Sequence, residues 1–129
     1  MKKQDAAFLF ALGIAIWAAG TYYYAARGAR FLETSGARFW VNFFLPPAVS
    51  AAMCIALLNW RHIAPAHWAA ATLLLAIPGM VGEAIVLSHL ATFMPRLHVT
   101  SAGIYGAFLF ATYTLVLAVA EVVTLRATA

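Results

Sequence analysis

The chain has 129 residues, of which 65% are hydrophobic and 9% are charged, and its formal net charge is +4. Soluble domains carry about 25% charged residues, so this composition excludes an ordinary soluble domain and favours a single membrane domain over residues 1–129. The positive charges are spread over ends and loops and form no basic block, which disfavours nucleic-acid binding. The single Cys54 excludes an intramolecular disulfide, a CxxC redox pair and a Cys-rich metal site.

Four apolar segments are long enough to span a hydrocarbon core, which needs about 20 residues. In chain order they cover residues 6–26, 39–60, 68–90 and 103–125. The first follows two lysines, as in a signal peptide, but its length and the lack of a clear cleavage site favour a membrane helix. Trp40, Trp60 and Trp68 fall at predicted helix ends, as in an aromatic belt. The sequence predicts an all-α polytopic membrane protein, a bundle of four transmembrane helices.

The Lys and Arg residues give no orientation, because four lie on each side of the predicted membrane. Either other features fix one orientation, or copies insert both ways and pair antiparallel. The side with both termini carries Lys2, Lys3, Arg61 and Arg126, and the other side carries Arg27, Arg30, Arg38 and Arg96.

Small residues recur every three or four positions in three of the segments, a spacing that lets membrane helices approach closely. Such stripes fit plain packing inside the bundle, and they also offer faces for a homo-oligomer. The stripes are Ala7, Ala11, Ala15 and Ala19; Thr72, Ala76, Gly79 and Glu83; and Gly103, Ala107, Ala111, Thr114, Ala118 and Glu121.

Glu83 is an acidic residue inside an otherwise apolar segment, just past a predicted helix break at Pro78-Gly79 and next to Gly82. An acidic residue at the centre of a membrane helix costs roughly 3 kcal/mol. Chains that keep one usually point it into a bundle interior or a wet cavity. Glu83 is therefore the first candidate for a functional residue.

Other polar residues fall at the same depth. At about 1.5 Å of rise per residue, Glu83 lies roughly 22 Å into the bilayer from the side of the termini, level with residues 21–24. Asn42 and Tyr113 lie within about one helical turn of that level. Pro46-Pro47 also falls there, and we expect it to kink its helix and free carbonyls that protein or a cavity must satisfy.

This layer has two interpretations. In one, Glu83 binds a proton or a cation, with Tyr23, Asn42 and Tyr113 as neighbours that add hydrogen bonds or cation–π contact. In the other, Glu83 only hydrogen-bonds a kinked neighbour and holds the bundle together. Glu121 is a secondary candidate, but it lies only about 6 Å from the end of its segment and can reach water.

No cofactor, metal site or catalytic residue is expected. His62, His67, His89 and His98 are not spaced as ligand pairs on one helix or at one depth. The chain contains no GxSxG, HExxH, P-loop or dinucleotide fingerprint, so an enzyme is not expected.

The chain resembles a bacterial family of small four-helix membrane proteins of unknown function. The resemblance rests on Gly13, Trp17, Gly20-Thr21, Tyr23 and Gly28, on Pro46-Pro47, on Pro78-Gly79-Met80 with Gly82-Glu83, and on Tyr105-Gly106. It implies an architecture and no activity. Small multidrug-resistance transporters are only an analogy, because that family keeps its carboxylate in the first helix, which here contains no acidic residue.

The function expected from the sequence is that of a small integral membrane protein that carries out proton-coupled transport or efflux through Glu83. The alternative is an accessory or assembly subunit of a membrane complex, or a lipid-binding protein. The expected partners are the lipid bilayer, further copies of the chain and a small cationic or apolar ligand. The expected location is the bacterial cytoplasmic membrane.

Overall fold

All regular elements in the described part of the chain are helices. The computed structural model describes residues 2–32, 35–96 and 102–129, with residues 28–32 described by their backbone alone. The helices are α1 Lys3–Leu32, α2 Ala37–Trp60, the short 3₁₀ helix η1 Pro65–His67, α3 Trp68–Ser88, α4 Leu90–Phe93 and α5 Ala102–Thr128. Four of these helical stretches are long and apolar enough to cross a membrane, as predicted.

The helix boundaries differ from the predicted ones mainly at the ends. α1 and α5 extend beyond the predicted segments 6–26 and 103–125 because polar residues continue the helix past its apolar part. The predicted segment 68–90 is divided at His89, whose φ of −132° and ψ of 45° end α3 and start α4. His98 lies outside the described residues.

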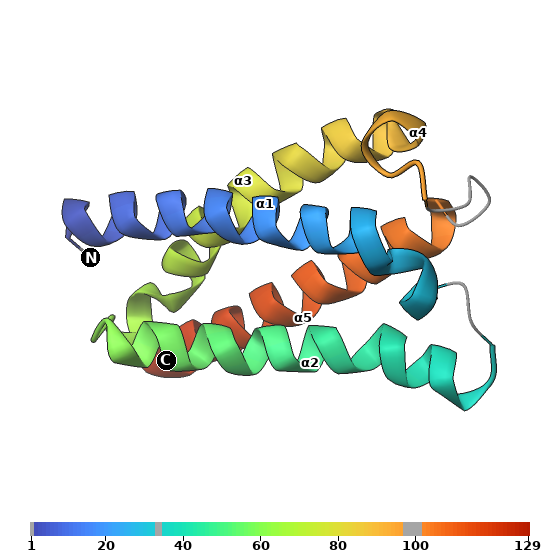
Figure 1. Ribbon diagram of the computed structural model, residues 1–129. Coiled ribbons are helices and arrows are strands. Elements are labelled where there is room, and N and C mark those ends of the chain that lie inside the picture. Colours follow the sequence, from blue (N-terminus) through green and yellow to red (C-terminus); the bar gives the residue numbers. More distant parts are fainter. Residues whose placement is uncertain (1, 33–34, 97–101) are drawn as a thin grey trace.

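The spatial order of the helices is not their order along the chain (Figure 1). α1 packs mainly on α3, α2 packs mainly on α5, and α3 and α5 also pack together. α1 and α2 are consecutive but share a smaller contact. Both termini lie at the same end of the bundle (Figure 1).

Two glycines allow α1 and α3 to approach closely. A Cβ atom at Gly13 would collide with the backbone of Leu75, and one at Gly82 would collide with the indole ring of Trp17. The packing face of α1 therefore contains Gly13 and Trp17. The alanine stripe of α1 is exposed instead, so an interpretation of it as packing within the bundle is wrong.

The other two small-residue stripes differ in burial. Thr72, Ala76, Gly79 and Glu83 of α3 are all buried. Most of the α5 stripe, including Ala107, Ala118 and Glu121, is exposed, because the buried face of α5 is formed by Tyr105, Phe108 and Ala120.

The prolines do not interrupt the helices, so the expected break at Pro78-Gly79 is corrected. α2 is continuous through Pro46 and Pro47, and α3 is continuous through Pro78. Each proline lacks the N–H that would bond the carbonyl four residues earlier. Membrane helices tolerate such positions where neighbouring groups satisfy the released carbonyls.

Two hydrophobic clusters form the core. The first includes Leu9, Leu58 and Trp68, near the end with the termini. The second includes Val86, Met94 and Tyr105, toward the other end. Trp68 belongs to this core at 5% exposure, in contrast to the predicted belt position, whereas Trp40 and Trp60 are exposed at 57% and 65%.

Candidate functional site

Glu83 lies inside the bundle, where α1, α3 and α5 come together. Only 8% of its surface is exposed. The hydroxyl group of Tyr105, from α5, donates to Glu83 Oε2 over 3.4 Å. Tyr105 is itself 1% exposed, so this side chain-to-side chain bond is buried.

α1 contributes a hydroxyl group and an indole N–H. Thr21 Oγ1 lies next to the Glu83 carboxyl but does not meet hydrogen-bond geometry with it. Trp17 Nε1 lies against Gly82, where α1 packs on α3. Both atoms are buried and have no hydrogen-bond partner among the described residues, so two polar atoms of this layer remain available to a further group.

Aromatic rings from α1 and α5 pack around Tyr105, the residue that bonds Glu83. The ring of Tyr24 packs edge-on against Tyr105 at 5.8 Å and in a tilted arrangement against Phe108 at 5.3 Å between centroids. The hydroxyl group of Tyr113 rests on Gly79, where a Cβ atom would collide with it. Gly79, one turn before Glu83, thus makes room for a second tyrosine hydroxyl in this layer.

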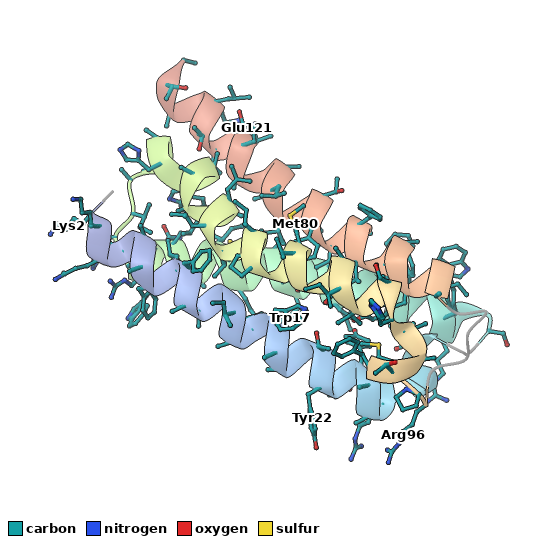
Figure 2. The ribbon with its side chains drawn as sticks, turned by 90° about the horizontal axis from the view of Figure 1, so that it is seen from above. Lys2, Trp17, Tyr22, Met80, Arg96 and Glu121 are labelled. Carbon is teal, nitrogen blue, oxygen red and sulfur yellow. The ribbon has the colours of Figure 1, made fainter. Side chains whose placement is uncertain are left out.

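The residues predicted to form the site are only partly gathered around Glu83. Tyr113 belongs to its surroundings. Tyr23 is 42% exposed and packs its ring edge-on against Tyr24 at 5.4 Å, on the outer side of the layer. Asn42 is half-buried on α2, one turn before the proline pair. Glu121 is exposed near the C-terminal end of α5, away from this layer (Figure 2).

Sequence reasoning missed Trp17, Thr21, Tyr24 and Tyr105. A signal for the first three was present, because residues 17, 21 and 24 follow Gly13 at steps of four, four and three and so share one helix face. The predicted depth of residues 21–24 was right for Thr21 and Tyr24, but depth alone did not separate the inward Tyr24 from Tyr22 and Tyr23. Figure 2 shows Tyr22 pointing away from the bundle.

The chemistry of the site is that of one carboxyl group among hydroxyl groups. No Lys, Arg or His in the described ranges forms an ion pair with Glu83. A buried carboxylate without a counter-ion is costly, and uptake of a proton or a cation removes that cost. Within residues 2–32, 35–96 and 102–129, no three His, Cys, Asp or Glu side chains gather as metal ligands would.

The fold and the site define a small helical protein with four helices long and apolar enough to span a membrane, built around one buried glutamate. The chain belongs to DUF5367, a family of unknown function, which matches residues 31–127. This membership confirms the resemblance drawn from the sequence. No curated protein and no solved structure matches the chain. The matched range contains Glu83, Tyr105 and Tyr113, whereas Trp17 and Thr21 precede it.

Proposed function

We propose that the protein is a proton-coupled secondary transporter of the bacterial cytoplasmic membrane and not an enzyme. Glu83 exchanges a proton for a small cationic or apolar ligand in this proposal. The observation that carries it is the buried carboxyl group, which lacks a counter-ion among the described residues and faces hydroxyl groups from two neighbouring helices.

The outer surface of the bundle supports the membrane location. Large apolar side chains are exposed along every long helix, for example Ile14 at 47%, Phe44 at 55%, Val81 at 58% and Phe110 at 72%. Water-soluble proteins rarely expose so much contiguous apolar surface, whereas lipid tails cover it without cost.

The position of Glu83 supports an exchange role. Its neighbours come from α1 and α5, both of which pack on α3. A tilt of either helix against α3 would change the distance from the carboxyl to Thr21 or Tyr105. Proton binding and helix packing are therefore linked, which is the requirement for coupling a proton to a conformational change.

The test is transport in reconstituted vesicles that contain a pH-sensitive dye and carry an imposed proton gradient. A panel of organic cations is added outside, and proton release is followed. We expect wild-type protein to release protons with at least one cation and Glu83→Gln to lose this response. Glu121→Gln is the matched control, because the same change is made at an exposed site, and it should behave as wild type. Equal responses from all three proteins would reject the proposal.

Difference infrared spectroscopy in lipid tests the site itself, without a known substrate. A carboxyl band that disappears in Glu83→Gln, and that changes with pH and with added cations, would support exchange at Glu83. A band that ignores both pH and every cation would assign Glu83 to a fixed hydrogen bond.

A second candidate function is that of an accessory subunit in a larger membrane assembly or a homo-oligomer. The outward stripes of α1 and α5 favour it, because small exposed residues such as Ala11, Ala15 and Ala107 let a partner helix approach closely. In that case Ala11→Leu and Ala15→Leu should reduce co-purification or cross-linking between copies, while Glu83→Gln has no effect on a transport assay.

A further inference from the structure

The end of the bundle that carries both termini contains a pocket unrelated to Glu83. Its volume is about 300 Å³, and it is lined by Lys2, Asp5, His62, Ile63, Ala64 and His67. These residues come from the start of α1, the connection after α2, and η1. Figure 2 shows Lys2 at this extremity of the molecule.

The polar groups of the pocket favour an anion. Asp5 is the single acidic residue in the lining, and its carboxylate is paired with Arg61 at 2.6 Å. Lys2 adds an ammonium group, and His62 and His67 add two imidazole rings that donate hydrogen bonds. An anion therefore meets donors from three side chains without facing an unneutralised carboxylate.

The backbone at His62 gives an independent argument. α2 ends with His62 N–H donating to the Asn59 carbonyl and Ile63 N–H donating to the Leu58 carbonyl, at 3.1 and 3.0 Å. This is the Schellman motif, in which the residue that bears the left-handed conformation is usually glycine. Here it is His62, with a φ of 55°. His62 therefore places a side chain where this motif usually has none, and that side chain lines the pocket.

The walls of the pocket are fixed by hydrogen bonds. Trp68 Nε1 donates to the Ile63 carbonyl at 2.9 Å in a buried position. Thr124 Oγ1 of α5 donates to the Pro65 carbonyl at 3.1 Å and accepts from Ala69 N at 3.0 Å. The backbone around residues 63 and 65, on which His62 and His67 are carried, is therefore held in place before any ligand arrives, which lowers the cost of binding.

The pocket also lies where lipid headgroups are expected. The exposed ring of Trp60 lies next to Phe8, with centroids 6.3 Å apart, and the Arg61 guanidinium lies 4.5 Å from the Phe8 ring centroid. Trp and Arg at the ends of apolar helices mark the headgroup level of a bilayer. Anionic headgroups are concentrated at that level.

We propose that this pocket binds a phosphate group, and that the phosphate belongs to the headgroup of an anionic phospholipid. Lys2 and the two imidazole rings donate to the phosphate oxygens, and Arg61 neutralises the Asp5 carboxylate that shares the pocket. This role does not depend on transport through Glu83.

Native mass spectrometry of the purified full chain, with added phosphatidylglycerol or phosphatidylcholine, tests the proposal. We expect wild-type protein to retain phosphatidylglycerol in preference to phosphatidylcholine. His62→Gly keeps the Schellman motif and removes one donor, so it should raise the melting temperature yet weaken phosphatidylglycerol retention by about tenfold. His67→Ala should weaken it similarly. Arg38→Ala, which removes a cation at the opposite end, is the control and should retain lipid as wild type does.

Competition with glycerol phosphate identifies the source of the phosphate. If it does not displace the lipid, the acyl chains contribute and the ligand is the phospholipid. If millimolar glycerol phosphate displaces it, the pocket takes phosphate from solution and the lipid assignment is overturned. Equal retention of both lipids, or unchanged retention in His62→Gly and His67→Ala, would overturn the phosphate site altogether.

Discussion

At the scale of single residues, the described neighbours of the Glu83 carboxyl supply hydroxyl groups and no opposite charge. The Tyr105 hydroxyl reaches Glu83 Oε2 over 3.4 Å, and Thr21 lies beside the same carboxyl. The site can therefore adapt to either a neutral or a charged carboxyl, since a hydroxyl group both donates and accepts.

The contribution of Tyr105 can be measured by removing one oxygen atom. Tyr105→Phe should lower the free energy of unfolding by about 1 kcal/mol, because the Glu83 carboxyl loses a buried hydrogen bond. The carboxyl band of Glu83 in the infrared spectrum should move to higher frequency, as expected for a group with fewer bonds. Tyr22→Phe is the control, because Tyr22 is 78% exposed. An unmoved band in Tyr105→Phe would show that the bond does not form in lipid.

The close packing of α1 against α3 at Gly82 leads to a second prediction at the scale of single residues. Gly82→Ala places a methyl group against the Trp17 indole and should destabilise the protein by about 1–3 kcal/mol. Gly20→Ala is the matched control, because a Cβ atom at Gly20 meets nothing within 4 Å, and it should be neutral or slightly stabilising. Unfolding in mixed micelles with increasing SDS, followed by circular dichroism, measures both. If the two variants change the stability equally, Gly82 does not pack closely against Trp17 as described.

At the scale of helices, connections between elements are as important as apolar faces. Thr124 of α5 joins η1 to α3 by accepting from Ala69 N and donating to the Pro65 carbonyl. One side chain thereby satisfies two backbone groups at the start of α3, where a helix lacks internal partners.

Removing this hydroxyl group should loosen the start of α3. Thr124→Val keeps the shape of the side chain but removes the hydroxyl group that bonds Ala69 N and the Pro65 carbonyl. We expect it to lower the free energy of unfolding by about 1–2 kcal/mol. Thr128→Val is the control, because the Thr128 hydroxyl bonds only carbonyls of its own helix, Thr124 and Leu125. Hydrogen exchange at Ala69 should increase in Thr124→Val alone. Unchanged exchange there would show that solvent replaces the hydroxyl without cost.

The four helices could be predicted from the sequence because length and apolar composition determine them locally. Glu83 could be found because an acid in an apolar segment is rare. The partners of Glu83 could not all be found, since Tyr23 and Tyr24 are equivalent in composition and depth and differ only in rotation about the α1 axis. That rotation is set by Gly13 and Gly82, whose effect requires knowing which helices are neighbours.

At the scale of the whole molecule, the equal positive charge at the two ends leaves the orientation in a membrane undetermined. The helix order places four Lys and Arg residues at the end with the termini and four at the other end. Neither end is favoured for the cytoplasm by the positive-inside rule. Large apolar side chains are exposed on all four long helices and on both halves of the bundle, so they favour neither orientation.

A small change in charge should therefore change the orientation. Ala127→Lys with Thr128→Lys should increase the fraction of chains whose C-terminus is cytoplasmic, and Ser35→Lys with Ala37→Lys should decrease it. A C-terminal fluorescent-protein or phosphatase fusion reports the two orientations in cells. If neither pair changes the ratio of the two signals, the orientation is fixed by features other than charge.

The spatial order of the helices has a consequence for biosynthesis. Because α1 packs mainly on α3 and α2 mainly on α5, each of the first two helices is synthesised before its principal partner. An unfinished chain that ends before α5 carries Glu83 without the Tyr105 hydroxyl. α5, synthesised after α1 to α4, thus completes the surroundings of the acid, and chains truncated before α5 should be recognised and degraded by membrane quality-control proteases.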